Sequence, residues 1–65
     1  MPETKPSIEH LQQQLQSAEA AGDPWKQGIA LNNLGDLFKN RNEQATARQY
    51  FQRALEFFTA LADLE

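Results

Sequence analysis

The sequence predicts an all-α fold of three antiparallel helices, and three observations support this prediction. Apolar residues recur at intervals of three and four along most of the chain, which is the periodicity of a helix with one buried face. Glycine or asparagine interrupts this pattern near residues 22 and 41, where short turns fit. The sequence has no alternating apolar and polar stretch and no run of β-branched residues, so nothing in it favours a strand.

The first helix is expected over about residues 7–21. Residues 1–6 contain two prolines, which disfavour helix, and we expect a disordered arm there. Ser7 can cap the helix because its hydroxyl can accept a hydrogen bond from an early backbone amide. Gly22 can end the helix because glycine tolerates a left-handed backbone. The apolar face of this helix consists of Ile8, Leu11, Leu15 and Ala18.

The second helix is expected over about residues 24–40 and the third over about residues 43–63. Asp23 followed by Pro24 is a typical helix start, with a capping side chain and then proline at the first helical position. The asparagines of residues 40–42 suit a turn and a left-handed cap of the second helix, and Asn42 can also cap the third helix. Residues 7–65 would then form one three-helix domain. The apolar residues of these two helices are Trp25, Ile29, Leu31, Leu34, Leu37, Phe38, Ala47, Phe51, Ala54, Leu55, Phe58 and Ala62.

Length, cysteine content and charge argue against several classes of function. A chain of 65 residues can bury only one small core, and a core of this size seldom contributes more than roughly 3–5 kcal/mol. The absence of cysteine excludes disulfides and thiolate metal sites. The net charge of −3 gives no general attraction to nucleic acid or anionic membranes, and no apolar run reaches membrane-spanning length. Because no secretory signal is recognisable either, we expect a cytoplasmic protein that binds neither nucleic acid nor membranes.

No residue pattern indicates an enzyme or a metal site. His10 is the single histidine, whereas a zinc site needs three or four convergent ligands. The chain has neither a phosphate-binding glycine loop nor a nucleophile elbow. Hydrolysis by paired carboxylates needs an enclosed cleft, and we expect none in a three-helix layer. We therefore predict no catalytic residue, no metal and no cofactor. The carboxylates weighed in this respect are Glu43, Glu56, Asp63 and Glu65.

Residues 11–23 and 51–63 resemble each other at an offset of 40 residues. An offset of this size is typical of helical-pair repeats. The first and third helices are therefore predicted to be equivalent elements. The identical pairs are Gln12 and Gln52, Leu15 and Leu55, Ala20 and Ala60, and Asp23 and Asp63.

Small and large apolar residues of the second and third helices match a known repeat signature. They are Leu34, Gly35, Phe38, Ala47, Phe51 and Ala54, with Leu31 in the place often taken by tryptophan. This set resembles the tetratricopeptide repeat, and one full repeat would span residues 28–61, preceded by the second helix of another repeat. Gly35 would let the two helices approach closely, while Phe38 and Phe51 fill the groove between them. Thr59 replaces the usual terminal proline, which leaves open an excised fragment of a longer array or a small protein that ends on a long helix.

Residues 31–34 and 50–56 are similar to repeats of kinesin light chains and of related cyanobacterial and bacterial arrays. The resemblance implies binding of a peptide or helix, with polar residues of the first helix of each repeat lining a concave face and bonding to the backbone of the bound peptide. It assigns this role to Asn32, Asn33 and Asp36. An ordinary polar helix face is the alternative. The carboxylate-clamp subclass is disfavoured, because Asn32 and Asn33 stand where it needs basic residues.

Two further expectations concern large apolar side chains. Trp25 is expected to pack on the first helix, with an exposed recognition anchor as the alternative. The third helix carries a second apolar line beside its intramolecular stripe of Ala47, Phe51, Leu55 and Phe58. One repeat cannot bury both lines, so we expect a homo-oligomer, most simply a dimer, joined through the second line of the third helix, with the first helix as a further candidate surface. That line consists of Tyr50, Phe57, Leu61 and Leu64.

These features predict a protein-interaction and assembly module that binds a peptide or helix of a partner protein and associates with itself. A self-assembling structural unit is the first alternative. A small nucleic-acid-binding regulator is the second, but it would need a basic helix. The cations of the second and third helices are instead scattered among acidic residues; they include Lys39, Arg41, Arg48 and Arg53.

Overall fold

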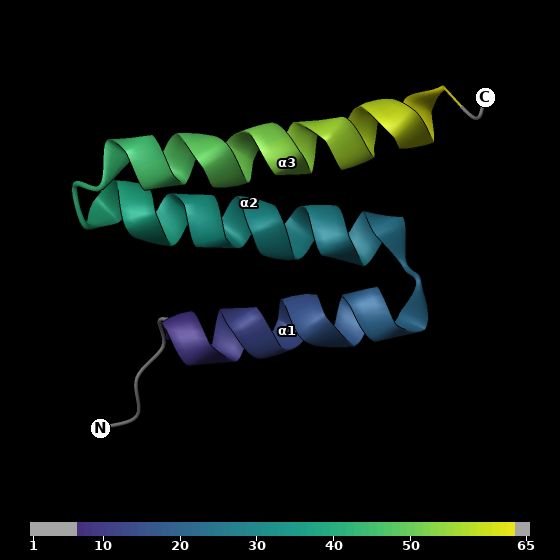
Figure 1. Ribbon diagram of the computed structural model, residues 1–65, viewed down its shortest axis with the longest axis horizontal. Coiled ribbons are helices and arrows are strands. Elements are labelled where there is room, and N and C mark those ends of the chain that lie inside the picture. Colours follow the sequence, from purple (N-terminus) through teal and green to yellow (C-terminus); the bar gives the residue numbers. More distant parts are fainter. Residues whose placement is uncertain (1–6, 64–65) are drawn as a thin grey trace.

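The computed structural model describes residues 7–63 and contains three α-helices: α1 (Ile8–Ala21), α2 (Pro24–Asn40) and α3 (Gln44–Ala62). Neighbouring helices run in opposite directions (Figure 1). The described residues contain no strand, so the prediction of an all-α fold with three helices is confirmed. The arm predicted at residues 1–6 lies outside the described residues, as does Leu64 of the predicted dimer line.

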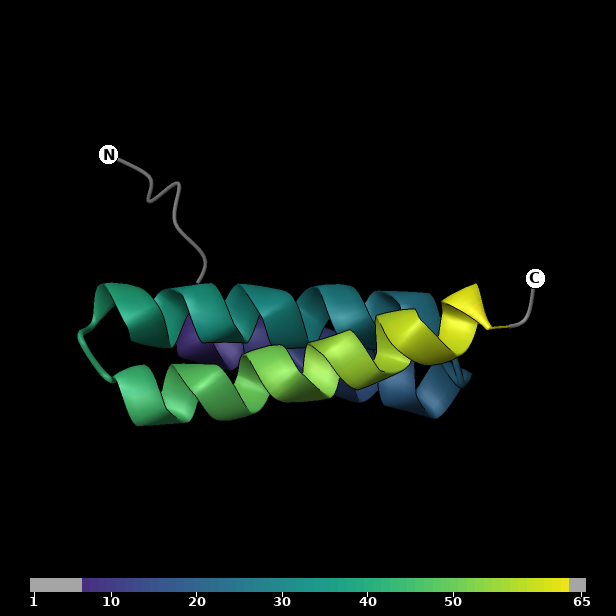
Figure 2. The ribbon, with the colours of Figure 1, turned by 90° about the horizontal axis from the view of Figure 1, so that it is seen from above.

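The helix α2 lies between α1 and α3 and contacts both of them, while α1 and α3 make no contact within residues 7–63. In the view from above, α3 crosses α2 at an angle, so that its N-terminal half lies to one side of α2 and its C-terminal end reaches the level of α2 (Figure 2). The molecule measures 43 × 25 × 15 Å, and its thinnest dimension is little more than the diameter of one helix, about 10–12 Å. An arrangement this thin encloses no interior space, so its functional side chains have to lie on its surfaces.

The two turns between the helices share one hydrogen-bonding pattern. In the first turn Gly22 has a φ of 65°, and the next backbone N–H donates to the carbonyl of Ala18 at 3.0 Å. In the second turn Asn42 has a φ of 66°, and the next N–H donates to the carbonyl of Phe38 at 2.9 Å. This is the Schellman arrangement, which needs a residue that tolerates the left-handed region. Glycine and asparagine are the two residues best suited to it.

The helix starts agree with prediction for α1 and α2 but not for α3. The Ser7 hydroxyl and the Asp23 carboxylate each accept a hydrogen bond of 3.1 Å from the backbone N–H three residues later. The helix α3 has Glu43 at its N-cap, without a side-chain hydrogen bond. Asn42 therefore does not cap α3, whereas the left-handed cap expected from the asparagines after α2 is confirmed at this residue.

The core runs along both sides of α2 and consists of small and medium-sized side chains. Four of its seven residues are alanine, so the helices approach closely, but each of these alanines buries little apolar area. The described part of the chain has no buried polar side chain. The core residues are Leu11, Ala18, Ala30, Leu31, Leu34, Ala47 and Ala54.

Two glycines set the distance between α2 and α3. A Cβ atom at Gly35 would lie 2.6 Å from the ring of Phe51, and one at Gly28 would lie 2.8 Å from the ring of Phe58. Carbon atoms in unstrained contact stay about 3.5–4.0 Å apart, so neither position accepts a side chain unless the ring moves. The predicted close approach at Gly35 is confirmed. The matching contact at Gly28 does not follow from the repeat signature.

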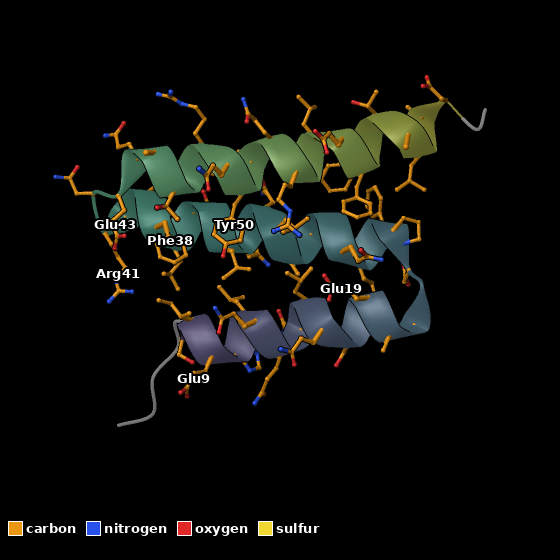
Figure 3. All side chains as sticks on the ribbon, viewed as in Figure 1. Glu9, Glu19, Phe38, Arg41, Glu43 and Tyr50 are labelled. Atoms are coloured by element: carbon orange, nitrogen blue, oxygen red, sulfur yellow. The ribbon has the colours of Figure 1, made fainter. Side chains whose placement is uncertain are left out.

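The apolar residues of α3 are distributed differently from expectation. The ring of Tyr50 stacks on that of Phe38, with centroids 5.5 Å apart and planes at 3° (Figure 3). Phe57 and Leu61 are half-buried as well. Leu55, expected in the intramolecular stripe, is 64% exposed, so that expectation is wrong. The residue before it is buried against α2, and one step along a helix is a rotation of about 100°, which turns Leu55 past the contact.

Candidate functional site

One side of α2 is open to solvent. Trp25 is 57% exposed and Ile29 is 41% exposed, and Asn32 and Asp36 are exposed as well. These four residues follow one another at intervals of three and four, so they form a single row on the helix. The row has two large apolar side chains toward its N-terminal end and two polar side chains beyond them.

This open row borders α3. Trp25, Asn32 and Lys39 are seven residues apart, a spacing that keeps them on one edge of the helix. The ring of Trp25 lies edge-on against that of Phe58, with centroids 5.2 Å apart and planes at 67°. Lys39 lines a hollow together with Phe51 of α3. Asn32 lies between these two contacts along α2 and is therefore placed beside the α2–α3 contact.

Trp25 does not pack as expected on the first helix. Its aromatic neighbour is Phe58 of α3, and more than half of its surface is exposed. The indole ring therefore contacts α3 in the C-terminal half of that helix, and it still presents a large apolar surface to solvent.

An open hollow of about 320 Å³ lies along α3, which supplies six of its seven lining residues, and Lys39 near the end of α2 borders it. Its apolar part is formed by Ala47, Phe51 and Leu55, and its rim carries the cations Lys39 and Arg48. None of the lining residues is acidic, although the chain has a net charge of −3. The lining residues are Lys39, Gln44, Ala47, Arg48, Phe51, Gln52 and Leu55. We refer to this hollow and the open row of α2 together as the α2–α3 face.

The three predicted peptide-binding residues do not share one position on this face. Asn32 and Asp36 lie one turn apart on the open row of α2. Asn33 is half-buried, and a step of one residue turns it about 100° away from Asn32. A ligand lying along the row can therefore contact Asn32 and Asp36 together, with Asn33 to one side.

The predicted dimer line offers less free apolar surface than expected. Tyr50, Phe57 and Leu61 are half-buried within the chain, and Tyr50 is partly covered by Phe38. The most exposed large apolar residue among those described is Leu55, which that line does not include. A role of Tyr50, Phe57 and Leu61 in an interface stays a prediction.

Sequence reasoning does not single out four residues of the α2–α3 face: Ile29, Lys39, Arg48 and Leu55. The spacing of seven between residues 25, 32 and 39 is the signal that could have placed Lys39 beside Asn32. No such signal distinguishes Leu55 from a core residue, because it fits the helical apolar pattern.

Other kinds of site have little support among the described residues. His10 is exposed on α1, and its Nε2 atom lies 3.2 Å from Nε2 of Gln14. Residues 7–63 hold no group of three His, Asp or Glu side chains arranged to bind a metal ion. In the same part of the chain, no helix is both long enough and apolar enough to span a membrane.

Comparisons of the chain with family models, with curated proteins and with solved structures give no match. The resemblance to tetratricopeptide repeats is one of signature residues, and no matching relative supports it.

Proposed function

We propose that this chain is a protein-interaction module of the tetratricopeptide-repeat type, which binds a helix or peptide of a partner protein on its α2–α3 face. The observation that carries the proposal is the exposure of three large apolar side chains on this face: Trp25 at 57%, Ile29 at 41% and Leu55 at 64%. Single exposed apolar residues are common on protein surfaces. A group of them bordered by polar residues is typical of a binding surface.

The packing of α2 against α3 supports the repeat assignment. The signature places glycine opposite a large aromatic residue, and Gly35 lies against Phe51 in this way. The buried alanines Ala47 and Ala54 fit the same pattern of small residues at a narrow helix crossing. The arrangement of α1, α2 and α3 is consistent with one helical hairpin preceded by the second helix of another.

The residues of the face have complementary roles in this proposal. Trp25 and Ile29 supply apolar contact area, and tryptophan in particular often dominates the binding energy of an interface. The amide of Asn32 can both donate and accept hydrogen bonds, and the carboxylate of Asp36 accepts them. Such groups can pair with the backbone of a bound segment. The thin, open layer supports a role in binding without catalysis.

The test is selection of binders from an unbiased display library of peptides about as long as α2, which has 17 residues. We expect selected peptides to lose about tenfold or more in affinity, measured by titration calorimetry, when Trp25→Ala or the pair Asn32→Ala and Asp36→Ala is introduced. Asn32 and Asp36 are exposed and contribute little to folding, so circular dichroism should show unchanged helix content for that pair. Trp25→Ala also loses its contact with Phe58, so its affinity is measured at a temperature where circular dichroism shows the variant folded. The matched control is Gln12→Ala with Gln16→Ala, an exposed pair with the same spacing on α1. Failure to select any peptide, or affinities that ignore these changes, would overturn the proposal.

Self-association is a second candidate function, favoured by the exposure of Leu55. Sedimentation equilibrium of the wild type, Leu55→Glu and Phe57→Glu distinguishes the possible interfaces. A dimer that only Leu55→Glu dissociates would use the α2–α3 face, and one that only Phe57→Glu dissociates would use the predicted line. A folded monomer of the wild type at high concentration would exclude self-association.

A further inference from the structure

We infer that the hollow along α3 binds an amphipathic helix of a partner protein, in which acidic residues follow a large apolar anchor by one to two turns. This inference rests on the proposed function and specifies the shape, charge and direction of the ligand.

The first argument concerns shape and comes from the equivalence of α1 and α3. The contact face of α1 packs on α2, and two of its residues, Leu11 and Ala18, are 2% and 3% exposed. At the offset of 40 residues the equivalent positions of α3 are Phe51 and Phe58, whose rings already lie against Gly35 and Gly28 of α2, and between them Leu55, which is exposed. In α1 a face with this spacing is covered by an antiparallel helix, so the uncovered side of the α3 face, at Leu55, suits an antiparallel helix too. The equivalent pairs are Leu11 and Phe51, Leu15 and Leu55, and Ala18 and Phe58.

A second face of α1, turned by about 100° from its contact face, shows that a further helix can add at only one end of the layer. The residues of α1 equivalent to Tyr50, Ala54 and Phe57 are polar and exposed. They leave no apolar surface for a further helix to cover. A docking helix therefore adds beside α3 and not beside α1. These polar residues of α1 are His10, Gln14 and Ser17.

The second argument concerns charge. The rim of the hollow carries Lys39 and Arg48, and no acidic residue lines it. Opposite charges at an interface favour one partner over others and speed association. An acidic partner would therefore be selected at this position, although the chain as a whole carries a charge of −3.

The direction of the partner helix follows from the two arguments together. Arg48 precedes Leu55 by seven residues, which is about 10 Å along α3. In a helix antiparallel to α3, a residue near Arg48 lies C-terminal to the residue that contacts Leu55. Acidic side chains are therefore expected about four to seven residues after the apolar anchor, on the same side of the partner helix.

The experiment uses the full chain and the unbiased peptide library. Peptides selected on the wild type should be enriched in Asp or Glu about four to seven residues after a large apolar residue. Leu55→Ser should weaken their binding about tenfold or more without loss of helix content, because Leu55 is 64% exposed. In a second selection on Lys39→Glu with Arg48→Glu, the preference at those positions should reverse to Lys or Arg. Arg53→Glu is the matched control, because Arg53 is an exposed cation of α3 that does not line the hollow.

Several outcomes would overturn the inference. Selected peptides without the acidic preference would do so, as would an acidic preference that survives the charge reversal. Peptides that depend on Trp25, Asn32 and Asp36 but not on Leu55 would overturn it and leave the proposed function intact, whereas no selected peptide at all would overturn both. A wild-type dimer that Leu55→Ser dissociates and that no selected peptide displaces would show that a second copy occupies the hollow instead.

Discussion

Substitution of Gly35 tests the helix contact on which the repeat assignment depends. A Cβ atom at this position would lie 2.6 Å from the nearest carbon of the Phe51 ring. Restoring an ordinary carbon contact of about 3.5 Å requires the ring to move by roughly 1 Å for alanine, and by more for a longer side chain. The open hollow beside Phe51 gives the ring some room to move. We therefore expect alanine to be tolerated at this position and leucine to be strongly destabilising.

A side chain at Gly35 has two effects on the free energy of unfolding, a gain in helix propensity and a cost of overpacking, and their signs are opposite. Replacing glycine by alanine within a helix stabilises by about 0.5–1 kcal/mol, whereas overpacking costs about 1–3 kcal/mol. The terms nearly offset each other for Gly35→Ala, which we expect to change stability by less than about 1 kcal/mol. For Gly35→Leu the overpacking dominates, and a loss of about 1–3 kcal/mol would lower the melting temperature by roughly 5–20 °C in a domain of this size.

Urea and thermal unfolding followed by circular dichroism measure these changes. The double mutant with Phe51→Ala isolates the contact, because Gly35→Leu should cost less once the ring is gone, with a coupling energy of about 0.5–3 kcal/mol. The control is Asp36→Leu, the same new side chain on the exposed row, which should stay within about 0.5 kcal/mol of the wild type. An unchanged melting curve for Gly35→Leu, or an equal loss with and without Phe51, would show that Gly35 is not at the helix contact and that the repeat assignment is wrong.

Three further predictions concern the turns and Trp25. Asn42→Ala should destabilise by about 1–2 kcal/mol, because its φ of 66° disfavours alanine, while Asn42→Gly should not destabilise; equal losses in urea unfolding would contradict this. Asp23→Ala removes a capping hydrogen bond and should cost about 1 kcal/mol, whereas Glu43→Ala, at an N-cap without one, should stay within about 0.5 kcal/mol; similar costs would argue against the capping role. Trp25→Ala should lose about 0.5–1.5 kcal/mol of aromatic contact with Phe58 beyond the loss of buried area, and strictly additive effects with Phe58→Ala would refute that contact.

The sequence by itself determines the number of helices and most of their ends, because these features depend on local interactions. The Ser7 cap, the left-handed Gly22 and the Asp23–Pro24 start each involve residues within about one helical turn of one another. The ambiguity at Asn42 has a local cause as well. Asparagine suits both an N-cap and a left-handed position, and its residue type does not distinguish between them.

Only the tertiary structure decides which apolar residues remain exposed. Helical periodicity shows which residues share a face, but it does not show which neighbouring helix covers that face. Apolar residues surround much of α3, so Tyr50 and Leu55 were both compatible with burial or exposure. The close approach of α3 to α2 at Gly28 and Gly35 half-buries Tyr50 and leaves Leu55 in solvent. The α2–α3 face therefore depends on where three helices lie relative to one another, which no local pattern encodes.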